Sequence, residues 1–325
     1  MRRRAALGLL GAALACPATL RAQGTLDAVA DRATRFDQLH SLIVMQDGRE
    51  VLARAPRGPG LDRVANVKSV SKTLLSLLVG VGVGRGVITP ADALLPLLGR
   101  SPTGDARDDI VLADLLSMRG GLGSTSGGNY GAWVSSPNWV SYALDQPVVA
   151  PPGERFIYST GTTHLLGAAL AEAAGDDLLD LFRAWIGGPA DVDFAPWVRD
   201  PQGYWLGGND MGISPRDLGR IGQVCLNGGA WNGTQVIPAD WLEQAWTPRA
   251  RSPFSGDRYG WGWFLTRLAG HDAAYARGYG GQVLAVVPGL DAVIVITSDP
   301  MQPARSGGYF GDLRSVMEEA AAALG

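Results

Sequence analysis

The sequence contains few of the residues on which metal centres and disulfide frameworks depend. Its 325 residues include two cysteines and three histidines. The histidines, His40, His164 and His271, have no zinc-ligand spacing, which disfavours a metallohydrolase. Only Cys225 lies beyond the N-terminal segment, so an exported form has no intramolecular disulfide and no thiolate metal cluster. We therefore expect no metal and no cofactor.

Lysine is nearly absent as well. Lys68 and Lys72 are the only lysines among the 28 Lys and Arg residues, and every other cation is arginine. Arginine stays protonated at any working pH and cannot serve as a base. Lysine thus occurs only in the one stretch where a cationic side chain that can lose its proton would matter. Lys72 is therefore a candidate catalytic residue.

The sequence also lacks an apolar run long enough to span a bilayer permanently. Three arginines at 2–4, the apolar residues 5–15 and the segment 19–23 have the three parts of a secretory signal. Consecutive arginines resemble a twin-arginine export signal, and a general secretory signal fits nearly as well. Cys16 is a poor match to a lipoprotein box. We expect a signal peptide over 1–22, cleavage near Ala22, and a periplasmic or secreted protein with no stable membrane insertion.

A basic tract is missing from the remainder of the chain. Residues 1–22 carry four arginines and no acid, so 24 basic and 31 acidic residues remain beyond them. The net charge of about −7 disfavours nucleic acid and anionic membranes as partners. The expected partner is a small-molecule ester, amide or peptide-like substrate. An α/β-hydrolase triad is disfavoured too, because no Gly-x-Ser-x-Gly occurs.

The stretch that is most informative runs from residue 66 to 79. A polar opening turn leads into a helix that is apolar nearly all round and bounded by glycines at 80–84. Ser69 and Lys72 lie three apart, so both project from one face of that helix. A serine needs a base to attack a carbonyl, and a lysine kept neutral by burial can be that base. The alternative is a capped helix with a solvated lysine.

Periodicity elsewhere predicts strands at both ends of the chain and helices between them. Residues 41–46 and 49–54 flank an Asp-Gly turn, and 282–287 and 292–297 flank a Pro-Gly turn, so each pair predicts a hairpin. Residues 259–265 alternate as a strand would. Helices are expected at 25–39, 90–98, 110–118, 160–174, 215 onward from an N-cap at Ser214, and 313–324. The fold class is therefore α/β (α+β): one antiparallel sheet from N- and C-terminal segments, flanked by helices, with an inserted helical lobe. Within 23–325, we expect the sheet lobe at about 23–95 and 255–325 and the helical lobe at about 96–254.

Two further stretches could complete a site. Tyr158 lies on a turn before a helix, where a structural anchor is the alternative role. The glycine-rich residues 278–282 could be a plain strand entry. They also suit a site where backbone approaches substrate and an N–H points at an oxyanion.

In their order along the chain, these motifs resemble the serine β-lactamase and penicillin-binding superfamily. The similarity is to the branch with class C β-lactamases, D-amino-acid peptidases, family VIII-type carboxylesterases and 6-aminohexanoate-dimer hydrolases. The resemblance makes Ser69 the nucleophile, Lys72 the base and Tyr158 a partner in proton transfer. It places 278–282 where the family has Lys-Thr-Gly or His-x-Gly, which makes Tyr279, Gly280, Gly281 and Gln282 oxyanion or substrate-binding residues. We expect the N–H groups of Ser69 and Gln282 to hold the oxyanion.

Two departures from the family pattern bear on the substrate. Thr160 replaces the asparagine of Tyr-x-Asn, and Tyr279 replaces the usual cation of the third motif. Arg277, two residues away and on the same strand face, could restore that charge. These departures favour an esterase or amidase over a dedicated β-lactamase. A β-lactamase, a D-Ala-type peptidase and a non-catalytic cell-wall or peptide-binding module remain the alternatives.

Overall fold

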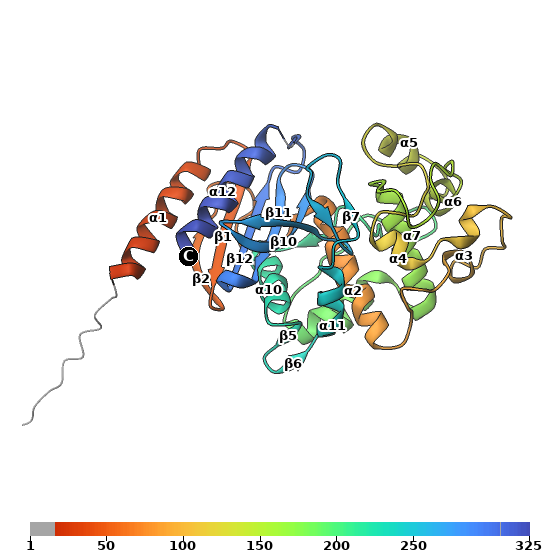
Figure 1. Ribbon diagram of the computed structural model, residues 1–325, viewed down its shortest axis with the longest axis horizontal. Coiled ribbons are helices and arrows are strands. Elements are labelled where there is room, and N and C mark those ends of the chain that lie inside the picture. Colours follow the sequence, from red (N-terminus) through yellow and green to blue (C-terminus); the bar gives the residue numbers. More distant parts are fainter. Residues whose placement is uncertain (1–16, 306) are drawn as a thin grey trace, which may run out of the picture.

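An eight-stranded antiparallel sheet forms the centre of the computed structural model, which describes residues 17–305 and 307–325 (Figure 1). Its strand order is β2-β1-β12-β11-β10-β9-β8-β7. The strands are β1 Leu39–Gln46, β2 Arg49–Arg54, β7 Ala250–Arg251, β8 Arg258–Tyr259, β9 Phe264–Leu268, β10 His271–Gly278, β11 Gln282–Val287 and β12 Ala292–Ser298. Because β1 pairs with β12, the two ends of the chain share one sheet, which confirms the predicted fold.

Both predicted hairpins are present. Asp47 and Gly48 join β1 to β2 with φ of 50° and 72°, the left-handed pair that a two-residue hairpin turn requires. Between β11 and β12, a short 3₁₀ turn at Pro288–Leu290 replaces a simple Pro-Gly turn. Two small sheets, β3 Ala65–Asn66 with β4 Gly212–Ile213 and β5 Ala230–Trp231 with β6 Thr234–Gln235, complete the strands described.

Helices cover both faces of the large sheet. On one face, α1 Pro17–Ala33 and α12 Tyr309–Leu324 lie side by side (Figure 1). On the other face, α10 Pro215–Leu226 packs on β11 and β12, and α2 Ser71–Gly84 follows beside β10. Each face has its own apolar core, because strand residues alternate between the two sides.

The helical lobe lies on the far side of α2 from α1 and α12 (Figure 1). Its longest helix, α7 Thr160–Ala174, begins at the N-cap Ser159 and ends at Gly175, whose φ is 68°. The others are α3 Leu94–Leu97, α4 Leu112–Leu116, α5 Tyr130–Val134, α6 Trp139–Leu144, α8 Leu178–Phe182 and α9 Gly188–Ala190, and α11 Ala239–Ala245 lies below the sheet. Since α7 packs on α2, it joins the lobe to the helix that follows Ser69.

Three predictions about elements and boundaries need correction. Residues 259–265 are not one strand, because β8 ends at Tyr259 and β9 starts at Phe264. The intervening glycines serve close packing, since a methyl group on Gly260 would lie 2.0 Å from the Ala245 carbonyl oxygen. The helix expected over 25–39 ends at Ala33. The helical lobe, expected to reach about 254, does not include α10, which packs on the sheet.

The predicted signal peptide falls largely on residues 1–16, which lie outside the described residues. Helix α1 begins at Pro17 and passes through the expected cleavage position near Ala22. Within 17–305 and 307–325, no helix has the length and apolar character needed to cross a membrane.

Candidate active site

Ser69 lies on a 3₁₀ turn, Lys68–Val70, that leads directly into α2. Lys68 has a φ of 50°, a left-handed conformation that costs a lysine energy and so needs support. The support comes from Asn66, whose side chain accepts from the Lys68 N–H at 2.9 Å. It also comes from Asp210, whose carboxylate lies 2.6 Å from the Lys68 Nζ atom. These contacts stabilise the turn and place Ser69 just before the first residue of the buried helix α2.

The Lys72 ammonium group is buried beside Ser69. Its side chain is 3% exposed, and its Nζ atom lies 3.1 Å from the Ser69 Oγ atom. Nζ also lies 3.2 Å from the Thr160 Oγ1 atom and 2.6 Å from the Gly208 carbonyl oxygen. Burial lowers the pKa of Lys72 from its usual value to about 7, although the negative charge of Asp210 opposes this. The alternative, a capped helix with a solvated lysine, is therefore wrong.

Tyr158 completes this group from the turn before α7. Its hydroxyl interacts with Ser69, and the Lys72 Nζ atom lies 5.0 Å from the centre of its ring. Ser124 holds the turn by donating its hydroxyl to the Tyr158 carbonyl oxygen at 2.7 Å. Burial raises the pKa of Tyr158, while the Ser69 hydrogen bond and the charge of Arg277 lower it. The structure thus brings the three predicted catalytic residues together.

Thr160, in place of the family asparagine, turns its hydroxyl toward the base. Besides contacting Lys72, the Thr160 Oγ1 atom lies 2.9 Å from the Ser126 Oγ atom. Ser126 also accepts from the Thr160 N–H at 2.8 Å. Thr160 therefore connects the lysine to the loop that enters the helical lobe.

Arg277 lines the pocket but has a structural neighbour as well. Its guanidinium lies 3.6 Å from the centre of the Phe310 ring and interacts with Tyr275. Burial lowers the pKa of Arg277, and the neighbouring Tyr275 and Tyr158 partly offset this. Its charge is thus close enough to Tyr158 to favour the tyrosinate form.

The glycine-rich residues 278–282 are arranged differently from the sequence-based prediction. The Gln282 side chain is fully buried, and its amide nitrogen donates to the Ser298 carbonyl oxygen at 2.8 Å. Gln282 starts β11, an inner strand between β10 and β12, and pairs with Gly278. Gln282 is not among the residues that line the pocket beside Ser69, so the structure gives no support to the oxyanion role predicted for it.

Gly280 and Gly281 form the turn between β10 and β11, with φ of 82° and 97°. A methyl group on Gly280 would lie 2.3 Å from the Asp299 carbonyl oxygen, and one on Gly281 2.7 Å from a Leu313 methyl. Both glycines are thus required by packing, and neither is placed at Ser69. Tyr279, in contrast, lines the same pocket as Ser69, and its side chain is 51% exposed.

A pocket of about 700 Å³ opens beside Ser69. Sequence reasoning missed Lys68, Asn209 and Tyr130 in its lining and Gly208 and Asp210 next to Lys72. The position of both lysines in one short stretch was a signal for Lys68. Among the residues described, no group of three or more His, Cys, Asp and Glu side chains could hold a metal ion.

Comparison of the sequence with protein-family models identifies the family to which this chain belongs. The model of the family described as Beta-lactamase matches residues 40–312, which is most of the chain. The chain belongs to the β-lactamase family. The family match and the fold thus agree with the superfamily that the sequence resembles.

Relatives of this β-lactamase-family chain include hydrolases of different kinds. A 6-aminohexanoate-dimer hydrolase of Paenarthrobacter ureafaciens is 24% identical over 312 residues, covering 86% of this chain and 78% of the relative. The solved structure of a family VIII carboxylesterase has a TM-score of 0.72 at 17% identity and covers 96% and 99% of the two chains. That of EstCE1, a hydrolase with promiscuous acyltransferase activity, has a TM-score of 0.76 at 16% identity and covers 93% and 100%. The structural likenesses establish the β-lactamase fold, and the family relationship supports a hydrolase.

Proposed function

We propose that the chain is a serine hydrolase that cleaves an ester or amide bond through an acyl-enzyme on Ser69. The observation that carries this proposal is the Lys72 Nζ atom, 3.1 Å from the Ser69 Oγ atom, on a lysine whose pKa is about 7. At that pKa about half of the lysine is neutral at pH 7 and able to accept a proton. A solvated lysine offers almost none of that form.

The reaction proceeds in two halves. Ser69 attacks the carbonyl carbon while Lys72 takes the hydroxyl proton. The tetrahedral intermediate collapses, the bond to the leaving group breaks, and that group receives a proton through Tyr158. Water then attacks the acyl-enzyme and gives its proton to the Tyr158 and Lys72 pair, which frees the acid and restores Ser69.

The oxyanion is held by two backbone N–H groups, those of Ser69 and Tyr279. Gly278, the last residue of β10, pairs with Gln282 on β11. The pairing of β10 with β9 ends at Tyr275, so the edge of β10 beyond it is open on that side. Successive N–H groups along a strand point in opposite directions, which directs the Tyr279 N–H away from β11. Gly278 packs so closely that a methyl group there would lie 2.5 Å from the Val67 carbonyl oxygen, which brings Tyr279 to the nucleophile turn.

The alternatives carry less support. A non-catalytic binding module does not need a buried lysine with a lowered pKa directed at a serine, because that arrangement costs stability. A β-lactamase or D-Ala-type peptidase needs a cation for the substrate carboxylate, and Arg277 is already stacked on Phe310. An esterase or amidase acting on an uncharged substrate needs neither the family asparagine at position 160 nor a cation at position 279.

The test is hydrolysis of p-nitrophenyl esters and of a chromogenic cephalosporin by the wild type and by Ser69→Ala. Ser315→Ala is the matched control, because Ser315 is a serine on α12 whose hydroxyl bonds only its own helix. We expect ester turnover that Ser69→Ala lowers about a thousandfold or more. Mass spectrometry after rapid quenching should find the acyl group on the peptide containing Ser69. Ester turnover that survives in Ser69→Ala would refute the proposal, and the cephalosporin rate measures the β-lactamase alternative.

We also propose export to the periplasm or medium through residues 1–22. Support comes from the arginines at 2–4 and the apolar residues 5–15. N-terminal sequencing of the protein recovered from an expressing bacterium should give a start near Gln23. A product that keeps Met1 and stays with the cytoplasmic fraction would contradict export.

A further inference from the structure

The pocket beside Ser69 has two unlike walls. One wall, from the loops of the helical lobe, is polar and consists of Ser124, Ser126, Tyr130 and Asn209. The other comes from the loop between β7 and β8, the end of β10 and the segment after β12. We call its three most exposed members, Phe254, Tyr279 and Met301, the apolar wall.

The apolar wall is unusually open to water. The exposed fractions of Phe254, Tyr279 and Met301 are 71%, 51% and 78%. They are three of the seven large hydrophobic residues that are exposed among residues 23–305 and 307–325, for which burial is described. Single exposed apolar residues are ordinary, but a group of them at a pocket marks a binding surface.

Two members of the wall, Tyr279 and Met301, belong to segments that pack next to each other and next to the Ser69 turn. Tyr279 follows Gly278, which packs against the Ser69 turn, and a methyl group on Gly280 would lie 3.0 Å from the Pro300 Cα atom. The turn at Tyr279 and the segment with Met301 therefore form one surface that runs outward from Ser69. An apolar group attached to a carbonyl at Ser69 would cover it.

We propose that the apolar wall binds a bulky apolar half of the substrate, so that the enzyme selects esters or amides joining an apolar group to a polar one. This inference rests on the proposed function. Burying apolar surface is favourable by about 0.8 kcal/mol per methylene, which is about fourfold in kcat/KM for each methylene that reaches the wall.

The experiment compares two series of esters on the full chain. One series lengthens the acyl group of p-nitrophenyl esters from acetate to octanoate, and the other lengthens the alcohol of acetate esters. We expect kcat/KM to rise along one series, and the series identifies which half binds the wall. In Phe254→Ser/Met301→Ser, the ratio of the longest to the shortest substrate should fall about tenfold. Val198→Ser, which changes an exposed valine outside the pocket lining, should keep the ratio.

The outcomes separate this inference from the proposed function. Ester turnover that depends on Ser69 but has the same chain-length ratio in wild type and double variant overturns the apolar wall alone. No turnover of any ester by wild type or Ser69→Ala overturns both. A steep chain-length preference that the double variant loses supports both.

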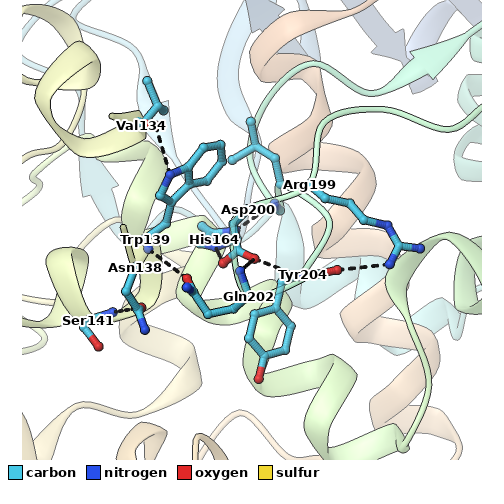
Figure 2. Close-up of polar contacts among 12 residues, drawn as sticks. Val134, Asn138, Trp139, Ser141, His164, Arg199, Asp200, Gln202 and Tyr204 are labelled. Carbon is cyan, nitrogen blue, oxygen red and sulfur yellow. Dashed lines mark hydrogen bonds and ion pairs between the residues drawn. The ribbon is translucent and has the colours of Figure 1, made fainter. Parts of the chain in front are cut away.

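A second inference concerns a buried pair behind the base, His164 and Asp200. Both side chains are fully buried, and the His164 Nε2 atom lies 3.0 Å from the Asp200 Oδ2 atom (Figure 2). The other carboxylate oxygen accepts from the N–H groups of Gln202 and Tyr204 at 2.9 and 2.8 Å. The mechanism proposed above does not use this pair.

Hydrogen bonding determines the tautomer of His164. The Gly207 N–H lies 3.4 Å from the His164 Nδ1 atom, and a backbone N–H can only donate. Nδ1 therefore accepts, and Nε2 carries the proton that it donates to Asp200. Asp200 thus holds the imidazole in the form that can bind the Gly207 N–H.

Gly207 precedes Gly208, whose carbonyl oxygen accepts from Lys72 at 2.6 Å. The segment fits closely against α7, because a methyl group on Gly207 would lie 2.6 Å from the Thr163 carbonyl oxygen. We infer that His164 and Asp200 are positioning residues that hold residues 207–208 and, through them, orient Lys72.

Asp200→Asn tests this inference. The amide oxygen must stay on the Gln202 and Tyr204 N–H groups, so the new NH₂ faces His164 and donates to Nε2. The proton then moves to Nδ1, where it opposes the Gly207 N–H. We expect ¹⁵N spectra of histidine-labelled protein to show the tautomer change. We expect kcat to fall about 10- to 100-fold with little change in KM. Asp177→Asn, which alters a surface partner of Arg199, is the matched control.

A second pair of variants covers the case in which Asp200→Asn does not fold. His164→Asn keeps an acceptor oxygen near Gly207, whereas His164→Leu removes it. We expect His164→Asn to retain a higher kcat than His164→Leu and to have a pH profile nearer the wild type. Equal kcat values and pH profiles in wild type and a folded His164→Leu would overturn the inference, as would a tautomer change without any effect on kcat.

Discussion

The carbonyl oxygen of Gly208 lies 2.6 Å from the Lys72 Nζ atom, closer than the Oγ atom of Ser69 at 3.1 Å. A carbonyl oxygen only accepts hydrogen bonds, so one N–H of Lys72 is directed at Gly208 in either protonation state. When the amine is neutral, its lone pair is then available toward Ser69. The orientation of the base thus depends on a backbone group that is 136 positions away in the chain.

Replacing Gly208 by alanine should therefore damage catalysis. The new methyl group would lie 1.9 Å from the Thr163 Oγ1 atom and 2.9 Å from its Cβ atom, so the backbone must move. We expect kcat to fall about 10- to 100-fold, because a displacement near 1 Å misplaces the base. The measurement is steady-state ester hydrolysis beside thermal unfolding. Gly24→Ala, where the added methyl group would meet nothing within 4 Å outside its own helix, is the control, and equal rates in both variants would contradict this role for Gly208.

The pH profile should report the titration of Lys72. Because burial lowers its pKa to about 7, the amine is protonated and inactive below that pH and neutral above it. We expect kcat/KM for an uncharged ester to rise about tenfold per pH unit well below pH 7 and to level off above it. If a lysine with an ordinary pKa governed the pH profile, the rising acid limb would lie several pH units higher.

Removing the charge of Asp210 should move that limb toward lower pH. The Asp210 carboxylate raises the pKa of Lys72, so Asp210→Asn lowers it further. Loss of the carboxylate also leaves the Lys68 cation uncompensated, which acts in the same direction. Asp62→Asn, an exposed partner of Arg216, is the control with the same change in net charge. An unchanged or upward-shifted limb in Asp210→Asn would be inconsistent with this arrangement.

Residues close together in sequence were the ones that sequence reasoning could place. Ser69 and Lys72 share one helical turn, and the motif before α7 identified Tyr158. Gly208 and Asp210 contact the site only through tertiary folding, so no local pattern indicates them. Gln282 lies outside the pocket lining because the lining depends on strand register: its pairing with Gly278 puts it on the inner strand. A shift of a few residues along a hairpin changes which residue lines the pocket.

The Thr160 hydroxyl should matter through its contact with Lys72. Its Oγ1 atom lies 3.2 Å from the Lys72 Nζ atom and 2.9 Å from the Ser126 Oγ atom. Thr160→Val keeps the shape of the side chain but removes its hydroxyl. The buried amine of Lys72 then loses one hydrogen-bond partner, and so does the Ser126 hydroxyl. We expect kcat to fall about tenfold and the acid limb of the pH profile to move lower, because a less solvated ammonium loses its proton more easily. Thr160→Ser keeps the hydroxyl and should stay within about threefold of wild type, a difference of less than 1 kcal/mol. If Thr160→Val and Thr160→Ser have the same kcat and the same limb, the hydroxyl has no part in holding the base, and the residue at this position acts only by packing.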